Sequence, residues 1–333
     1  MKRHSIWYSI KIVGLATCLT GAAALAVQPR QASAHGVLGK RFFPSTLVIH
    51  DPFASDELSL LYNRSKEPAS EEGPAVVEDE FSVEYSKRIF PGFAIGVEGE
   101  WRHRNPDGDQ EQESGFANPA VNAALEIFKN APHEAIVTLG FEANLGHIGS
   151  RDIEAEPYTT LSPSILFGKG MGDLPDGLKF LRPFAVTGVL GAGVPLKSTT
   201  RNVHTHFDEE TFETEVEVEV EHNPTVLNWG GTLQYNLQYL QTAVQDIGLG
   251  APFNRMVPLV EVALETGLND ESGRDTTGTV NPGVVWFGKT FQLGLEANIP
   301  VNERSGQNVG VRAQLHFFID DLFPGSLGKP IFE

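Results

Sequence analysis

The sequence predicts an all-β fold, a transmembrane antiparallel up-and-down β-barrel of about twelve strands that follows a cleaved signal peptide. Three observations predict it. Apolar residues recur at every second position over segments of about ten residues. The loops between these segments alternate between long polar and short. No apolar stretch after Val27 approaches the roughly twenty residues that a membrane-spanning helix needs. A membrane crossing would therefore use strands, because lipid leaves no backbone group unpaired.

The first 34 residues are typical of an export signal. Lys2 and Arg3 give a basic start, an apolar run follows over 12–27, and Ala32-Ser33-Ala34 supplies the small-residue cleavage pattern. We therefore expect a signal peptide over 1–34 and a mature chain that starts at His35. Residues 35–55 are then expected to form an N-terminal periplasmic segment, and residues 56–320 the barrel.

The clearest predicted strand carries apolar residues at odd positions from Ala135 to Leu145, with Thr138, Glu142 and Asn144 on the other face. The same two-faced pattern, which favours a strand with one lipid face and one polar face, recurs along the chain. The predicted strands lie near 56–63, 79–89, 93–103, 117–128, 134–147, 158–167, 182–196, 225–239, 256–268, 278–287, 290–300 and 308–320. The patterns at 158–167 and 182–196 are the weakest.

The loops support the barrel independently. Phe90-Pro91-Gly92 and Gly288-Lys289 predict tight turns, whereas 64–78 and 104–116 are long and polar. Outer-membrane barrels show this asymmetry, with short periplasmic turns and long outer loops. A soluble β-sandwich also alternates, but it does not account for ten-residue strands joined by regularly alternating loops. We therefore expect the protein in the outer membrane, in contact with its lipid.

Pro258 and Pro282 fall inside predicted strands, where a closed barrel offers no edge to accommodate them. The turns at 168–181 and 240–255 are longer than the rule predicts. These two features oppose the barrel, and we expect the prolines to mark bulges or strand ends.

Composition excludes several classes of function. The only cysteine, Cys18, lies in the predicted signal, so the mature chain would have no disulfide and no thiolate chemistry. Removing the signal leaves 21 basic against 43 acidic residues, a formal net charge of about −22, which excludes a nucleic-acid partner. No nucleophile elbow, P-loop, dinucleotide fingerprint or zinc-protease helix occurs, so we expect no enzyme.

The segment 196–224 is predicted to be an extracellular β-ribbon. Glutamates at odd positions from Glu213 to Glu221 alternate with apolar residues and Thr214, and residues 196–206 are able to fold back on them. His204 and His206 share one strand face, and with His222 they are candidate ligands for copper or zinc. A predicted amino-terminal His35 is a further candidate. The simpler interpretation is a solvated acidic loop, and no other cofactor is expected.

The inward faces predict an acidic lumen. Glu84 and Glu98 fall nearly opposite in the first hairpin, so a cation or shared proton must relieve their repulsion. If the lumen is open, its acidity favours cations, and if it is filled, the same residues form a packed polar plug. The candidate lumen residues are Glu84, Glu98, Glu100, Glu142, Glu261, Glu265, Glu296, Arg102, Arg312 and His316.

The end of the chain resembles outer-membrane proteins associated with the phenol meta-cleavage pathway. The resemblance lies in Gly294-Leu295-Glu296-Ala297, Ile299-Pro300-Val301-Asn302 and 310–317, and the start at 35–44 is similar to related exported proteins. It implies an outer-membrane barrel that passes small or apolar molecules, with no catalytic residues. The sequence thus predicts a channel or transporter for a small solute, or alternatively a metal-binding barrel.

The chain departs from such barrels at its end. Many of them finish on a terminal aromatic residue that the outer-membrane assembly machinery, a predicted partner, recognises. Here the last predicted strand ends near Phe318, and a tail of residues 321–333 follows.

Overall fold

The computed structural model describes residues 36–69, 74–108, 111–208, 213–269 and 275–333, and side chains within them except over 202–219. The predicted signal peptide and His35 lie outside the described residues. No helix in the described part of the chain is long and apolar enough to cross a membrane.

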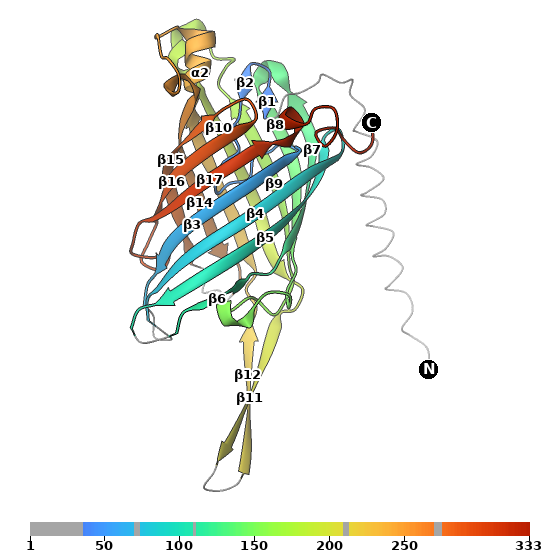
Figure 1. Ribbon diagram of the computed structural model, residues 1–333, viewed down its shortest axis with the longest axis vertical. Coiled ribbons are helices and arrows are strands. Elements are labelled where there is room, and N and C mark those ends of the chain that lie inside the picture. Colours follow the sequence, from blue (N-terminus) through green and yellow to red (C-terminus); the bar gives the residue numbers. More distant parts are fainter. Residues whose placement is uncertain (1–35, 70–73, 109–110, 209–212, 270–274) are drawn as a thin grey trace. The chain divides into compact units, whose positions relative to one another are not determined.

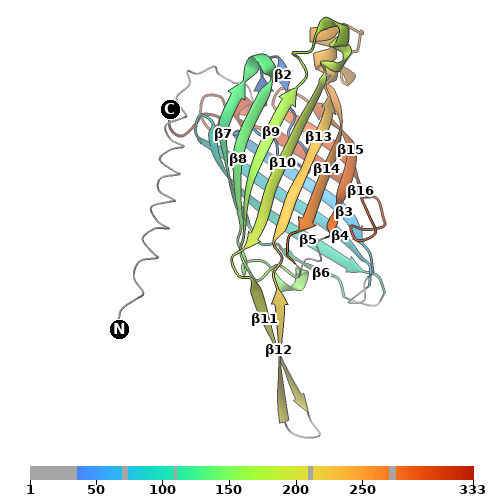
Figure 2. The ribbon, with the colours of Figure 1, turned by 180° about the vertical axis from the view of Figure 1, so that it is seen from behind.

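Twelve of the described strands form one antiparallel sheet that closes on itself (Figures 1 and 2). The last strand pairs with the first, from Val311 opposite Arg64 to Phe318 opposite Glu57. The strands are β3 (Glu57–Glu67), β4 (Val76–Phe90), β5 (Phe93–Pro106), β7 (Ala120–Asn130), β8 (Ala135–Asn144), β9 (Thr160–Gly170), β10 (Phe184–Pro195), β13 (Val226–Tyr235), β14 (Met256–Gly267), β15 (Thr276–Phe287), β16 (Phe291–Pro300) and β17 (Gly310–Phe318).

The outer face of this barrel is apolar. Val97, Leu295 and Phe81 are each about half exposed, at 53%, 54% and 49%, whereas the inward Gln292 and Glu261 are both 0% exposed. A water-soluble fold would reverse this arrangement. With every strand paired on both sides, the backbone is satisfied without water, as a bilayer requires. The predicted fold class is confirmed, and the protein is an outer-membrane β-barrel.

Each of the twelve predicted segments overlaps one of these strands, including the weakest two, which correspond to β9 and β10. The strand beside β5 is interrupted, because part of the predicted loop over 104–116 also pairs with β5. A short strand, β6 (Glu113–Phe116), pairs with the outer half of β5, and β7 takes over the pairing from Ala120. Pro119 lies between β6 and β7, where a residue without an N–H group cannot continue the ladder.

The two strand prolines sit where the ladder does not need their missing N–H groups. Pro258 lies just beyond Leu259, where the pairing of β14 with β13 ends. At Pro282 the pairing of β15 with β16 skips from Val280 to Gly283. Both side chains point outward and are exposed. The prediction that they mark strand ends or irregularities is consistent with this register.

The loops divide the barrel into two unlike ends. Tight turns at Pro91-Gly92, a 3₁₀ turn η1 (Ala131–His133) and residues 288–290 lie at one end, which also carries Glu57 and Phe318. Residues 171–183 and 236–255 lie at this end too and contain η3 (Asp176–Leu181), α2 (Leu237–Tyr239), a π-helical turn η4 (Leu240–Val244) and η5 (Phe253–Arg255). The long loops lie at the other end.

A two-stranded ribbon leaves the long-loop end between β10 and β13 (Figure 1). Its strands, β11 (Thr199–Asp208) and β12 (Glu213–His222), pair antiparallel from Thr199 opposite His222 to Asp208 opposite Glu213. Asn223 ties its base, donating from its backbone N–H to the carbonyl of Ser198 over 2.9 Å.

The tail returns to the wall at the short-turn end. After α3 (Ile319–Leu322), the backbone N–H of Phe332 donates to the carbonyl of Ile89 at 2.8 Å. Asp56, fully buried, holds this corner through ion pairs with Lys87 at 2.5 Å and Arg88 at 2.7 Å.

Candidate functional site

Residues 36–55 lie inside the barrel, and we call them the plug. They include a small hairpin of β1 (Val37–Leu38) and β2 (Arg41–Phe42). One carboxylate on the wall seats the deepest part. Glu261 of β14 accepts backbone N–H groups of Leu47 at 2.7 Å, Ile49 at 2.8 Å and Val48 at 3.3 Å. Consecutive N–H groups that converge on one anion form a strong, geometrically specific contact.

Wall side chains bind the plug backbone at further points. Gln292 donates to the carbonyl of Ser45 at 2.5 Å, and Asn236 donates to the carbonyl of Phe42 at 3.2 Å. Glu126 accepts the backbone N–H of Ala54 at 3.0 Å. These contacts satisfy plug backbone groups that the surrounding wall shields from bulk water.

Arg41 anchors the plug at the short-turn rim. Its Nε lies 2.7 Å from Glu134 Oε2, its Nη1 donates to the carbonyl of Pro183 at 2.9 Å, and its Nη2 donates to that of Arg182. Its guanidinium also lies 4.3 Å from the ring centroid of Tyr239. The side chains of Arg41 and Glu134 are 1% and 5% exposed, so a buried ion pair ties the plug to three turns.

Apolar contacts complete the seat. Leu47 packs against Leu259 and Val285 of the wall. Gly294 of β16 makes room for this contact, because a Cβ atom there would come 2.5 Å from Leu47 Cδ1. A second cluster joins the plug to β8 and β10 and consists of Leu38, Phe43, Phe53, Ile136 and Ala185. The plug is therefore seated on the β13–β17 wall, against residues of β7, β8 and β10, and at the rim.

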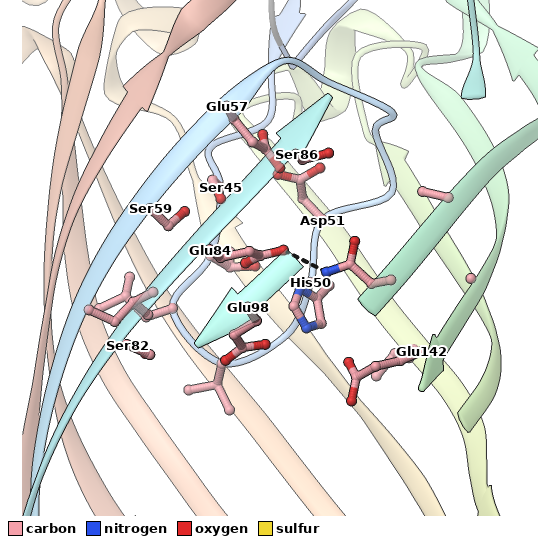
Figure 3. A pocket seen from close by; sticks show the side chains of 18 of the residues that line it. Ser45, His50, Asp51, Glu57, Ser59, Ser82, Glu84, Ser86, Glu98 and Glu142 are labelled. Carbon is pink, nitrogen blue, oxygen red and sulfur yellow. Dashed lines mark hydrogen bonds between the residues drawn. The ribbon is translucent and has the colours of Figure 1, made fainter. Parts of the chain in front are cut away.

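The opposite side of the lumen is open. A cavity of about 330 Å³ lies between the plug and the inner faces of β3, β4, β5 and β7 to β9 (Figure 3). Seven carboxylates line it, against Arg312 and His50. The carboxylates are Asp51, Glu57, Glu80, Glu84, Glu98, Glu100 and Glu142.

His50 projects from the plug into this cavity, where Glu84, Glu98 and Glu142 surround it (Figure 3). The residue is exposed to the lumen, although the barrel encloses it. Glu84 raises the pKa of His50 most and the enclosure lowers it, while Glu142, Glu98 and Asp51 raise it further, to about 9. At neutral pH the plug therefore presents a positive charge inside an acidic ring.

The hairpin spacing predicted Glu84 and Glu98 opposite each other, and the register of β4 with β5 places them so. Asn122 donates to Glu84 Oε1 at 3.3 Å and offsets part of their repulsion. One step further along β5, Arg102 donates to Glu100. Glu100 is thus the partly neutralised member of the group, and Glu84, Glu98 and Glu142 remain to attract a positive charge.

The structure divides the predicted lumen residues into three groups. Glu84, Glu98, Glu100, Glu142 and Arg312 line the cavity, with Arg102 beside them. Glu261, Glu296 and His316 are buried around the plug, at 0%, 2% and 0% exposure. Glu265 lies on β14 toward the long-loop end and is exposed.

His316 forms part of the wall interior. Its Nδ1 lies 2.7 Å from Ser59 Oγ, and its Nε2 lies 3.7 Å from Glu57 Oε2. Glu57 and Glu80 also face the lumen, but they were not in the predicted set. Glu57 lies at an inward position of β3 and Glu80 at an inward position of β4, so the alternation along each strand would have been enough to predict that they face the lumen. For His50 and Asp51 in the plug no such periodicity exists.

Of the four predicted metal ligands, only His222 has a described side chain. In the described part of the chain, no three His, Cys, Asp or Glu side chains are arranged to hold a metal ion. His222 is exposed at the base of the ribbon, and His35 lies outside the described residues. The backbone of His204 pairs with that of Glu217, and His206 with Glu215, but these side chains are not described.

No protein-family model matches the chain, and no curated protein matches it. Among solved structures it is similar to an outer-membrane channel from Pseudomonas putida F1, at 12% identity over 81% of this chain and 97% of that one, with a TM-score of 0.49. It is also similar to the KdgM porin, at 13% identity over 78% and 98% with a TM-score of 0.41, and to the NanC porin, at 10% identity over 78% and 98% with a TM-score of 0.43. Likenesses this distant carry no argument about function, and the closed order of strands itself establishes the fold.

Proposed function

We propose that the protein is an outer-membrane channel for a small solute and that it favours cations. The observation that supports this is the cavity of about 330 Å³ beside the plug, where seven carboxylates face Arg312 and His50. Rings of carboxylates in a narrow, low-dielectric passage concentrate cations and repel anions. Passage of a solute through such a channel needs no catalytic group.

The plug sets the width of the path. It is fastened to the β13–β17 wall through Glu261, Gln292 and Leu47, so the solute passes along the β3–β9 side. Leu166, Val189 and Phe53 line part of the cavity, and they suit a solute with a small apolar body. The sequence resemblance to proteins associated with the phenol meta-cleavage pathway is compatible with such a solute. We propose that the chain is related to these proteins.

Conductance in planar bilayers tests the proposal. Under a KCl gradient the reversal potential is expected to show cation preference. The double variant E84Q/E98Q should lose most of it, because it removes two facing charges from the passage. E303Q is the matched control, since Glu303 is exposed on the loop between β16 and β17. A preference for anions, or one unaffected by E84Q/E98Q, contradicts the cation assignment.

A second variant tests the path. Deleting residues 36–53 removes the plug and leaves Asp56 with its ion pairs to β4. We expect a several-fold larger unit conductance. A heated-versus-unheated gel shift verifies that the barrel has folded. A folded barrel that is silent both with and without the plug overturns the channel function.

A further inference from the structure

A second cluster of polar groups lies on the β13–β16 wall, away from the open cavity. It consists of Thr232, Glu261, Asn281 and Glu296, which are 3%, 0%, 0% and 2% exposed. None of the four lines the cavity beside His50. The proposed channel function does not use them as lining, so their burial requires a separate explanation.

The strand register brings the four together. Glu261 of β14 lies directly opposite Thr232 of β13 on one side and Asn281 of β15 on the other. Directly opposite residues place their Cβ atoms about 5 Å apart. Glu296 of β16 lies opposite Gly283, two residues along β15 from Asn281.

Gly283 allows Glu296 to lean across β15. A Cβ atom at this position would come 2.3 Å from Glu296 Cγ, so the side chain of Glu296 occupies the space above the glycine. From there its carboxyl group lies near that of Glu261, which is directly opposite Asn281. Two carboxyl groups, one carboxamide and one hydroxyl therefore converge behind the plug.

Several of these oxygen atoms have no hydrogen-bond partner among the described residues. They are both carboxyl oxygens of Glu296, the side-chain oxygen of Asn281 and the hydroxyl of Thr232. An unsatisfied buried polar group costs about 1–3 kcal/mol, and a charged group costs more. Glu261 differs, because it accepts three plug N–H groups. The oxygen atoms without a partner thus lie beside the Glu261 carboxylate, which already accepts the plug N–H groups.

The local charge identifies the missing partner. With both carboxyl groups ionised, Glu261 and Glu296 carry two negative charges, and Arg312, directly opposite Glu296 on β17, carries one positive charge. The remaining single negative charge matches a monovalent cation better than a divalent one. Carboxylate, amide and hydroxyl oxygens are hard donors, of the kind that coordinate hard cations.

We infer that Glu296, Asn281 and Thr232, with Glu261, form a binding site for a small monovalent cation of the sodium type. The ion neutralises the carboxyl pair and leaves Glu261 ionised to hold the N–H groups of residues 47–49. Binding therefore stabilises the plugged barrel. This site is independent of the conduction path, and its occupancy does not require transport.

Thermal unfolding of the detergent-solubilised barrel tests the site. The wild type is melted in NaCl and in N-methyl-D-glucamine chloride at equal ionic strength, and the melting temperature is followed as one salt replaces the other. We expect a saturable rise with Na⁺, since a ligand that binds only the folded state stabilises it. E296Q, which keeps the shape of the side chain, should lose the rise, and T232V should weaken the apparent affinity about ten-fold.

The control and a second readout keep the test decisive. E303Q, on an exposed loop, should keep the full Na⁺ dependence. Broadening of the ²³Na resonance by the wild type should be relieved in T232V, which decides the matter if E296Q does not fold. Equal melting of the wild type in the two salts overturns the site, and it would mean that a shared proton or water satisfies the carboxyl pair. Retention of the rise in E296Q overturns it as well.

Discussion

At the scale of single residues, the buried pair of Arg41 and Glu134 holds the plug to the rim. Glu134 sits at φ 48°, a left-handed conformation that few residues with a side chain adopt, and this brings its carboxylate toward Arg41 and the backbone N–H of Gly172 at 3.2 Å. Strain of this kind persists only where the surroundings hold the residue in place. Arg41 supplies that restraint.

Replacing Arg41 with Met should therefore destabilise the protein by about 3–5 kcal/mol, because it leaves the Glu134 carboxylate buried without a partner. The matched control is Arg64→Met. Arg64 also pairs with a carboxylate, Asp79 at 2.8 Å, but its side chain is 52% exposed, so the loss of stability should be much smaller. Urea unfolding of the detergent-solubilised barrel measures both. Similar losses for the two variants would show that Arg41 is not an anchor.

His50 gives the lumen a dependence on pH. Its raised pKa means that the charged form is favoured in the folded plug, a contribution complete below the ordinary value of about 6.5 and lost as pH rises through about 9. Asp51, enclosed in the same lumen with its pKa raised to about 7, is ionised over the upper part of this range. Both changes make the lumen more negative as pH rises. Glu84, Glu98 and Glu142 are the other ionisable groups that face His50.

We expect cation preference, read as the reversal potential, to increase between pH 7 and pH 10 with a step near 9. H50Q should show at pH 7 nearly the preference of the wild type at pH 10, and it should lack the step. E303Q should keep it. A step near 9 that persists in H50Q would assign it to another group and remove His50 from the mechanism.

At the scale of elements, the strands were predictable and the plug was not. A membrane strand repeats one physical requirement, apolar toward lipid and polar toward the lumen, at every second residue, and β16 shows it clearly. The plug is held by contacts between residues far apart in the sequence, such as Ile49 and Glu261, 212 positions apart, and Ser45 and Gln292, 247 positions apart. Many of them use plug backbone groups, so little of this interaction is visible in the plug's own sequence.

The candidate lumen residues divide in the same way. Inward glutamates such as Glu84 and Glu98 follow from strand period and hairpin register. Which of them face open space does not follow from the sequence, because the plug covers Glu261 and Glu296 and leaves Glu84 uncovered. The position of the plug decides that division.

The predicted copper or zinc site at His204 and His206 concerns a single element, the β11–β12 ribbon. The backbone register sets His204 opposite Glu217 and His206 opposite Glu215, which is compatible with a copper or zinc site at the ribbon. If the hypothesis holds, calorimetric titration with Zn²⁺ or Cu²⁺ should give a saturable isotherm that the double variant H204A/H206A abolishes. H103A is the control, since His103 lies on β5, a strand of the barrel. An isotherm unchanged in H204A/H206A eliminates the ribbon.

At the scale of the whole molecule, the lumen has a filled side and an open side. The filled side carries long polar side chains, such as Gln292, Gln314 and Glu261, that reach the plug backbone. The open side carries small residues between its glutamates. They are Ser59, Ser82, Ser86, Ala124, Gly140 and Ser164. Side-chain length on the two walls, more than barrel diameter, thus determines where a path remains beside the plug.

A barrel must be closed to lie in a lipid bilayer, since an open edge would leave a row of unpaired backbone groups there.

β17 places Leu315 directly opposite Leu60 of β3, and both side chains face outward. Such a pair has Cβ atoms about 5 Å apart, close to disulfide geometry. The predicted mature chain has no cysteine of its own, so L60C/L315C would introduce the only pair. We expect it to oxidise in the folded barrel and to abolish the difference in gel mobility between heated and unheated samples, because the ring can no longer open fully. L60C/L190C, with Leu190 on the distant β10, should not cross-link within one chain. If the first pair stays reduced in folded protein while the strands remain intact, the first and last strands are not neighbours and the barrel is not closed.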